Sequence, residues 1–230
     1  MTPGNRTAGN RPLVYGHRGA RTEEPENTLR SFRRAAELGA DGIELDVRVS
    51  ADGRLVVIHD ATVDRTTDGE GEVAALTLAQ LRSLDAGSGE RIPTLDEALA
   101  SFDGLVQVEI KAPEAVRVIR DLPERAVLTS FHPEVLEDAA RRLPRVARGL
   151  ITHRPGDDML RTAKDLGAAW VCPELTDALT PGLVERCHAA GLRVDGWPAA
   201  DRELLRGFVE LGVDAVTTDH PGRIEEWLTG

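Results

Sequence analysis

The sequence predicts a (β/α)8 TIM barrel, in which eight parallel strands alternate with helices and close into a cylinder. Eight short apolar or β-branched runs alternate with helical patterns along the chain, and four of the helical patterns end in glycine just before the next run. The length of 230 residues fits one barrel at the small end of the usual range, and 41% hydrophobic residues can fill its core.

A polar tail opens the chain. Residues 1–11 are expected to form this tail, and residues 12–230 are expected to form a single domain. The start of the chain lacks the apolar run that a signal peptide or a membrane span would need. The two cysteines, Cys172 and Cys187, lack metal or redox spacing, which favours reduced thiols and a cytoplasmic location.

The eight expected strands are all short and rich in apolar or β-branched residues. They are residues 12–16, 41–47, 105–110, 125–129, 146–151, 168–172, 192–196 and 214–218. A further run, residues 55–58, follows the Asp52-Gly53 turn and is expected to pair with the second strand as a hairpin outside the barrel. An open doubly wound sheet is the alternative, but the segment 16–19 lacks the Gly-x-Gly-x-x-Gly spacing typical of such sheets.

The helices between these strands have recognisable ends. The glycines expected to terminate them are Gly39, Gly167, Gly191 and Gly212. Thr77 with Gln80, and Thr94 with Glu97, are candidate capping boxes at helix starts. Residues 60–93 do not fit the repeat, which predicts a small insertion after the second βα unit.

Charged residues interrupt two of the apolar strands. Glu44 and Asp46 lie two residues apart on one strand, and Glu109 with Lys111 repeats the pattern on another. Side chains two apart on a strand share a face, and a parallel strand covered on both sides has no solvated face, so these charges must be partnered. Three carboxylates without cysteine or histidine favour a hard divalent cation, Mg²⁺ or Ca²⁺. The alternative is a structural cluster neutralised by Lys111 alone, which leaves three negative charges against one positive charge.

Two histidines follow strands at the matching edge of the expected barrel. His17 and His59 are candidates for an acid and base pair because imidazole titrates near neutral pH. Arg18 and Lys111 are candidate ligands of a phosphate or an oxyanion, and Lys111 is one of only two lysines beside 26 arginines. The remaining histidines are expected to be structural or solvent-exposed; they are His132, His153, His188 and His220.

The formal net charge of −11 disfavours broad attraction to nucleic acid or to an anionic membrane. A small molecule is therefore the expected partner. The sequence does not indicate an oligomeric state.

Several short motifs follow one another along the chain. They are His17-Arg18-Gly19, Pro25-Glu26-Asn27-Thr28, Gly42-Ile43-Glu44-Leu45-Asp46, His59-Asp60, Asp64-Arg65-Thr66-Thr67, Ile92-Pro93-Thr94-Leu95, Val108-Glu109-Ile110-Lys111, Ser130-Phe131, Trp197 and Thr218-Asp219-His220-Pro221. With these motifs the chain resembles the glycerophosphodiester phosphodiesterase family. These motifs are ordered across nearly the whole chain.

The resemblance implies a TIM-barrel hydrolase that uses one divalent cation to cleave glycerophosphodiesters into glycerol 3-phosphate and an alcohol. It implies metal ligands at Glu44, Asp46 and Glu109, and an acid and base pair at His17 and His59. It also implies phosphate contacts from Arg18 and Lys111, and an apolar wall from Trp197. Asn27 is expected to cap the first helix.

One segment departs from the family pattern. Trp197 is followed by Pro198-Ala199-Ala200, where such enzymes usually have Thr-Val-Asn, so the headgroup preference is open. Two other functions stay open: a phospholipase D of the same barrel class acting on lysophospholipid or sphingomyelin, and a noncatalytic barrel that binds a phosphorylated ligand. The short polar start of the chain argues against a membrane-bound substrate.

Overall fold

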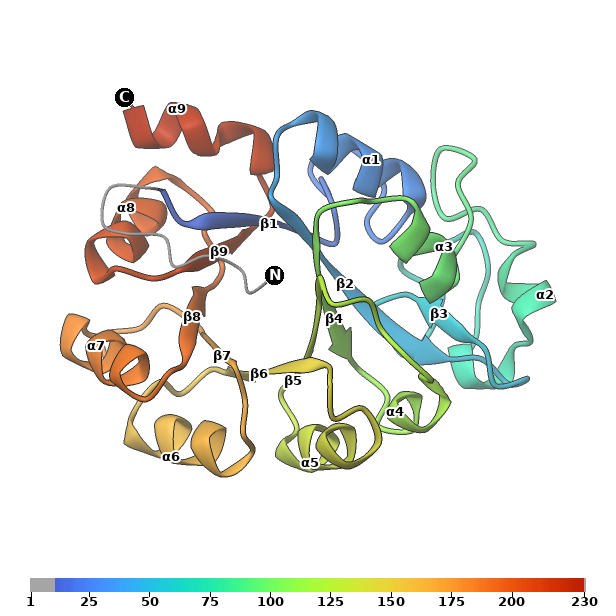
Figure 1. Ribbon diagram of the computed structural model, residues 1–230. Coiled ribbons are helices and arrows are strands. Elements are labelled where there is room, and N and C mark those ends of the chain that lie inside the picture. The colour runs from blue at the N-terminus through green and yellow to red at the C-terminus, as the bar shows by residue number, and fades with distance from the viewer. Residues whose placement is uncertain (1–10, 230) are drawn as a thin grey trace.

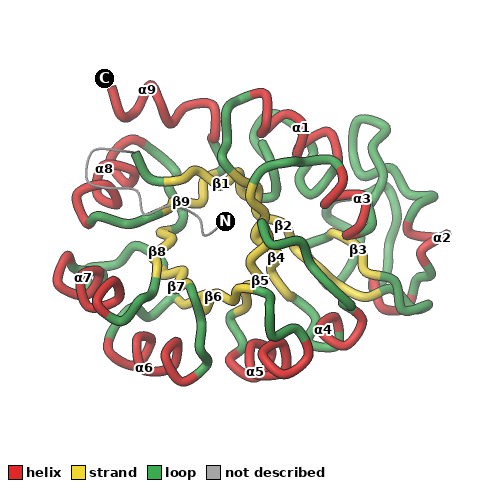
Figure 2. The backbone as a smooth tube through the Cα atoms, in the orientation of Figure 1, coloured by secondary structure: helices red, strands yellow, loops and turns green. Residues whose placement is uncertain are grey.

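The computed structural model describes residues 11–229 and shows a closed barrel (Figures 1 and 2). Its strands are β1 (Leu13–His17), β2 (Gly42–Val49), β4 (Leu105–Ile110), β5 (Ala126–Ser130), β6 (Ala147–Thr152), β7 (Trp170–Pro173), β8 (Arg193–Gly196) and β9 (Ala215–Thr218). All neighbouring pairs in this ring are parallel, and β1 pairs with both β9 and β2, which closes the cylinder. The predicted barrel is therefore confirmed.

The helices surround the strands as an outer layer (Figure 2). Their bounds are α1 Leu29–Glu37, α2 Leu78–Leu81, α3 Leu95–Ala100, α4 Ala115–Val118, α5 Pro133–Arg142, α6 Asp157–Asp165, α7 Pro181–Ala189, α8 Arg202–Leu211 and α9 Ile224–Thr229, with short 3₁₀ helices η1 (Val73–Ala75) and η2 (Pro221–Arg223). Among the described residues, no helix combines the length and apolar character needed to cross a membrane.

The predicted helix ends agree with the backbone geometry. Gly39, Gly167, Gly191 and Gly212 all have positive φ angles, between 57° and 81°, a region that glycine enters without a Cβ penalty. Both predicted capping boxes form, at Thr77 and at Thr94. The glycines therefore mark where helices end before the next strand, and the capping boxes mark where helices begin.

The hairpin and the insertion lie on one side of the barrel. Strand β3 (Leu55–Val57) pairs antiparallel with β2, as predicted. Residues 60–93 follow it, contain η1 and α2, and precede α3, the helix of the second βα unit. This segment packs its own small apolar cluster, which includes Val63, Val73 and Leu81, so it is anchored against the barrel wall.

The barrel interior is filled by side chains. An apolar layer inside it includes Tyr15, Trp170 and Ala215. A polar contact also spans the interior, because Gln107 on β4 donates to Asp195 on β8, and these two strands are not neighbours in the ring. Above these layers, the carboxyl ends of the strands carry the charged residues, which is where TIM-barrel enzymes place their active sites.

Candidate active site

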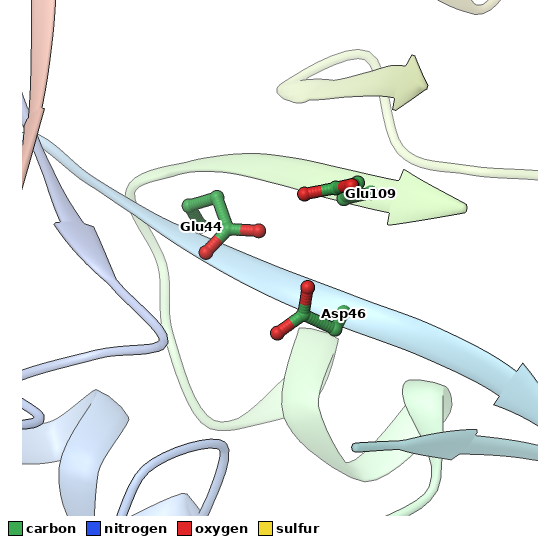
Figure 3. A group of neighbouring side chains, drawn as sticks. All are labelled: Glu44, Asp46 and Glu109. Carbon is green, nitrogen blue, oxygen red and sulfur yellow. The ribbon is translucent and has the colours of Figure 1, made fainter. Parts of the chain in front are cut away.

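Three carboxylates meet inside the rim of the barrel. Glu44 and Asp46 come from β2, and Glu109 lies opposite Asp46 in the parallel register of β4. One oxygen from each lies within 4.8 Å of the others, although the residues are only 4%, 0% and 8% exposed (Figure 3). The structure therefore brings together the three acids that the sequence singled out as candidate metal ligands.

Burial and mutual repulsion shift these carboxyl groups. Burial and the charges of Asp46 and Glu109 raise the pKa of Glu44 well above its ordinary value, and burial with Asp46 also raises the pKa of Glu109. Burial would raise the pKa of Asp46 too, but Lys111 and Arg18 hold that pKa below its ordinary value. Three carboxyl groups this close can all be ionised at low energetic cost only if additional positive charge lies beside them.

The oxygen donors of this cluster fit a hard divalent cation. The Oε1 atom of Glu44 and the Oδ1 atom of Asp46 are buried and have no hydrogen-bond partner among residues 11–229. Lys111 Nζ reaches Glu109 at 2.6 Å and Asp46 at 3.4 Å, so it does not neutralise Glu44 by direct contact. Three converging carboxylates, two of which have an oxygen without a hydrogen bond from the described residues, form the ligand type that Mg²⁺ and Ca²⁺ take.

The first histidine at the rim is held by a carboxylate that follows the last strand of the barrel. His17, at the end of β1, has its Nδ1 atom 2.6 Å from Oδ1 of Asp219, which follows β9. Its Nε2 atom lies 3.9 Å from Oε2 of Glu44. A neutral imidazole that donates Nδ1–H to Asp219 directs its Nε2 lone pair towards the carboxylate cluster.

The second histidine has the same kind of support. His59 Nδ1 lies 2.6 Å from Oδ1 of Asp60, the next residue along the chain. Burial lowers the pKa of His59, so the ring favours its neutral form, which can accept a proton. The Arg48 guanidinium fixes the backbone at this point by donating to the His59 carbonyl oxygen at 2.8 Å.

Arg18 lies between the cluster and the loop that follows β1. Its Nη1 donates to Glu26 at 2.8 Å, its Nε lies 3.2 Å from Asp46, and its backbone N–H donates to Glu44 at 3.1 Å. The residue has a φ of 54°, an uncommon conformation for a side chain with Cβ, and is only 8% exposed. Arg18 is therefore fixed by several contacts beside the candidate ligands.

Asn27 corrects one prediction. The side chain that caps α1 belongs to Thr28, which accepts from Ser31 N–H. Asn27 instead has a φ of 57° and turns its amide inwards, where it donates to Oδ2 of Asp46 at 2.8 Å. The sequence signal for a cap was correct in kind, but the threonine takes that place and the asparagine orients a candidate ligand.

An aromatic cluster borders the charged rim. Trp197 packs edge-on against Phe131 and His153, with ring centroids 5.8 and 5.2 Å away, and Phe131 stacks on His153 at 4.8 Å. Lys111 Nζ lies 5.7 Å from the centre of the Phe131 ring. The apolar wall expected from Trp197 thus includes two further rings, which sequence reasoning did not assign to the site.

The other histidines differ in their surroundings. His132 and His188 are solvent-exposed, and His188 lies in α7, as predicted. His153 is also exposed, but its Nδ1 pairs with Glu174 at 2.9 Å beside the aromatic cluster. His220 packs edge-on against Trp227 at 5.7 Å.

The departure after Trp197 is accommodated by the backbone. Ala199 is buried, its N–H donates to the Thr217 carbonyl at 2.9 Å, and its own carbonyl accepts from the Thr218 hydroxyl. The segment 198–200 therefore contributes main-chain bonds and an apolar methyl group, but it offers no polar side chain to a substrate.

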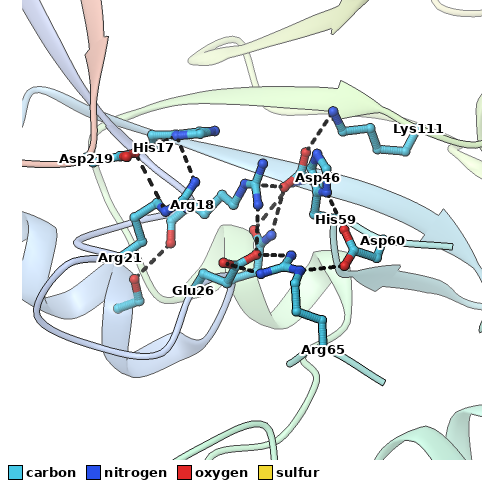
Figure 4. A network of polar contacts seen from close by, with 12 residues as sticks. His17, Arg18, Arg21, Glu26, Asp46, His59, Asp60, Arg65, Lys111 and Asp219 are labelled. Atoms are coloured by element: carbon cyan, nitrogen blue, oxygen red, sulfur yellow. Dashed lines mark hydrogen bonds and ion pairs between the residues drawn. The ribbon is translucent and has the colours of Figure 1, made fainter. Parts of the chain in front are cut away.

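Sequence reasoning assigned no role to the side chains that hold the two histidines. Asp60 and Asp219 each follow a strand within a quoted motif, so a carboxylate near a strand end was the available signal. Glu26 and Arg65 also lie in motifs that carry the family resemblance. They bond to each other and belong to the polar network around the site (Figure 4).

The comparisons with known proteins agree with this arrangement. The model of the glycerophosphoryl diester phosphodiesterase family matches residues 17–122 and 114–223. A glycerophosphodiester phosphodiesterase of Caldanaerobacter subterraneus is 38% identical, over 91% of this chain and 94% of its own.

Two solved structures share the fold. A phosphodiesterase from Oleispira antarctica, solved in complex with the product sn-glycerol-3-phosphate, has 31% identity and a TM-score of 0.85, covering 95% of this chain and 97% of its own. A glycerophosphodiester phosphodiesterase from Thermotoga maritima has 26% identity and a TM-score of 0.82, with 94% and 98% covered. The chain therefore belongs to the glycerophosphoryl diester phosphodiesterase family of enzymes, which confirms the resemblance found in its sequence.

Proposed function

We propose that the protein is a metal-dependent hydrolase that cleaves glycerophosphodiesters into glycerol 3-phosphate and an alcohol, with His17 and His59 as its acid and base. The observation that carries the proposal is the buried triad of Glu44, Asp46 and Glu109, flanked by two histidines that each have a carboxylate partner. The relative crystallised with sn-glycerol-3-phosphate supports the choice of product.

The three carboxylates would hold one Mg²⁺ or Ca²⁺ ion. When bound, this cation would lower the pKa of an attacking hydroxyl group and offset the negative charge that develops on the phosphate. Asn27 and Arg18 support the site from the protein side, because both contact Asp46 and so restrict its orientation.

The two histidines would divide the proton transfers. Burial lowers the pKa of His59, so this ring is available as a base at neutral pH. Asp219 holds the Nδ1 atom of His17 at 2.6 Å and so fixes the orientation of the ring, and His17 would be the group that carries a proton to the departing alcohol. The nucleophile can be the substrate's own hydroxyl or water, and either one needs such an acceptor.

Arg18 and Lys111 would hold the phosphate oxygens, and Trp197 would line the apolar side of the substrate. Contact with Asp46 and Glu109 raises the pKa of Lys111 even though burial opposes this, so the ammonium stays charged. Because Lys111 lies beside the Phe131 ring, its charge adjoins the aromatic cluster where the carbon chain of an alcohol can pack. The cytoplasmic location and the absence of nucleic-acid or stable membrane partners stay predictions.

The test is release of glycerol 3-phosphate from glycerophosphocholine, measured with a coupled assay under Mg²⁺ or Ca²⁺ and with a chelator. We expect His17→Ala and His59→Ala each to lower kcat by about 10²- to 10⁴-fold, the usual contribution of a positioned acid or base. His132→Ala, in which an exposed histidine is removed, is the matched control and is expected to keep full activity. Unchanged turnover in either site variant would remove that histidine from the mechanism.

Two outcomes would redirect the proposal to the other functions left open by the sequence. Faster turnover of a lysophospholipid than of glycerophosphocholine indicates a phospholipase D. Binding of glycerol 3-phosphate without turnover of either diester indicates a noncatalytic barrel.

A further inference from the structure

Arg65, a residue of the insertion, reaches the polar network of the candidate active site (Figure 4). Its Nη1 and Nη2 atoms donate to the two oxygens of Glu26 at 2.9 and 2.8 Å, and its Nε donates to Oδ2 of Asp60 at 2.6 Å. Among the described residues, every hydrogen bond from the Arg65 side chain goes to one of these two carboxylates.

Each of these carboxylates leads to a different group of the site. Asp60 bonds through its other oxygen to Nδ1 of His59 at 2.6 Å. Glu26 accepts from Nη1 of Arg18 at 2.8 Å, and Arg18 in turn contacts Asp46. One guanidinium therefore connects a proposed base with a proposed phosphate ligand.

The charges along this connection are well matched. Burial would raise the pKa of Glu26, but Arg65 and Arg18 lower it to about 2, and the bond from Arg65 is the main cause of a lowered pKa at Asp60. Both carboxylates are thus ionised at neutral pH and alternate with guanidinium cations in the order Asp60, Arg65, Glu26, Arg18, and the His59 ring adjoins this chain at Asp60. Such a chain fixes the orientation of its members more strongly than isolated surface pairs do.

The geometry requires arginine at position 65. A planar guanidinium offers a two-pronged contact to Glu26 and a third N–H on its side for Asp60, whereas a lysine ammonium is a single point charge on a flexible stem. Arg65 is 48% exposed, so it fills no core space, and its role does not depend on apolar packing.

We propose that Arg65 is a positioning residue, which acts through Glu26 and Asp60 to hold Arg18 and His59 at a fixed separation around the phosphate. The inference rests on the proposed function, because it names a residue that serves that reaction without touching the substrate. The insertion would then contribute to catalysis, since it supplies the arginine that links Asp60 with Glu26.

The test compares Arg65→Lys and Arg65→Gln with the unmutated enzyme in steady-state hydrolysis of glycerophosphocholine at saturating cation. We expect kcat to fall by about 10- to 100-fold in both variants, because small displacements of catalytic groups have effects of this size. KM should change less than kcat, and the melting temperature should stay close to that of the unmutated enzyme. Lysine should fail to restore the rate although it keeps the positive charge.

Arg34→Gln is the matched control. Arg34 also pairs with two carboxylates through Nε and Nη1, Glu23 at 2.8 Å and Glu37 at 3.0 Å, and it lies on the outer helix α1. This variant should keep the kcat of the unmutated enzyme.

A double-mutant cycle separates positioning from a general effect on the fold. If Arg65 acts through Asp60, then Arg65→Gln should cost much less in an Asp60→Asn background than in the unmutated enzyme. A kcat within about twofold of the unmutated value in Arg65→Lys, or additive effects in the cycle, would overturn the inference while leaving the proposed function intact. An unmutated enzyme that releases no glycerol 3-phosphate overturns the proposed function, and this inference with it.

Discussion

Asp195 gives the most direct test of how the barrel interior tolerates charge. Asp195 is 1% exposed, and its Oδ2 atom accepts from Gln107 at 2.8 Å and from Thr217 at 3.0 Å, while Oδ1 has no hydrogen-bond partner in the described part of the chain. Burial outweighs these two bonds and raises the pKa of Asp195 from 3.8 to about 6. Replacement by asparagine keeps the shape and one acceptor but removes the charge.

The sign of the effect follows from proton linkage. The folded state keeps the Asp195 proton up to a higher pH than the unfolded state does, so stability is lost as pH rises through the interval from 3.8 to about 6, and it stays lost above it. At about 1.4 kcal/mol per pKa unit, the full loss is about 3 kcal/mol. Asp195→Asn is not subject to this loss.

Equilibrium urea unfolding of both proteins at about pH 4.5 and about pH 7.5 measures the effect. We expect the free energy of unfolding of Asp195→Asn, relative to the unmutated protein, to increase by about 2 kcal/mol between these pH values, because part of the penalty is already present at the lower one. Asp158→Asn is the control, since the Asp158 side chain is 90% exposed and its difference should not change with pH beyond a few tenths of this amount. A pH-independent difference for Asp195→Asn would refute the assignment of a raised pKa.

Two further predictions concern the cation and the packing of β8. Mg²⁺ or Ca²⁺ at about 100 times its Kd should stabilise the protein by about 2.7 kcal/mol in calorimetry, and Asp46→Asn should lose most of this gain; no cation-dependent shift in the unmutated protein would contradict the metal site. Gly196→Ala should cost about 1 to 3 kcal/mol in urea unfolding, because the new Cβ would lie 2.2 Å from the Phe208 ring. Gly207→Ala, whose Cβ would meet Leu175 at 3.7 Å, should be neutral or stabilising, and equal losses in both alanine variants would contradict the packing argument.

The order of elements could be predicted because the signals for it are local. A parallel strand buried on both faces appears as a short apolar run, and a left-handed glycine marks the end of the preceding helix. The strand bounds differ from the predicted ones by at most two residues, because pairing decides them. For example, β1 continues to His17, since that residue is in register with Glu44 of β2.

The charged rim could be predicted from the same pattern, but its supporting contacts could not. Charge on the inward face of a buried strand is visible in the sequence, and the structure brings Glu44, Asp46 and Glu109 together. The partner of His17, by contrast, lies 202 residues away along the chain. Only the path of the loops decides that Asn27 turns towards Asp46 while its neighbour Thr28 caps the helix.

The two histidines are held by different parts of the molecule, and this has consequences for the enzyme. His17 depends on closure of the barrel, because Asp219 reaches it only when β9 pairs with β1. His59 depends on the hairpin and insertion, because Asp60 follows β3 and is held by Arg65. A perturbation of the insertion should therefore affect the contact between His59 and Asp60 and leave the contact between His17 and Asp219 in place, whereas loosening of the contact between β1 and β9 should do the reverse. The proposed acid and base can thus be tuned separately, although they serve one phosphate.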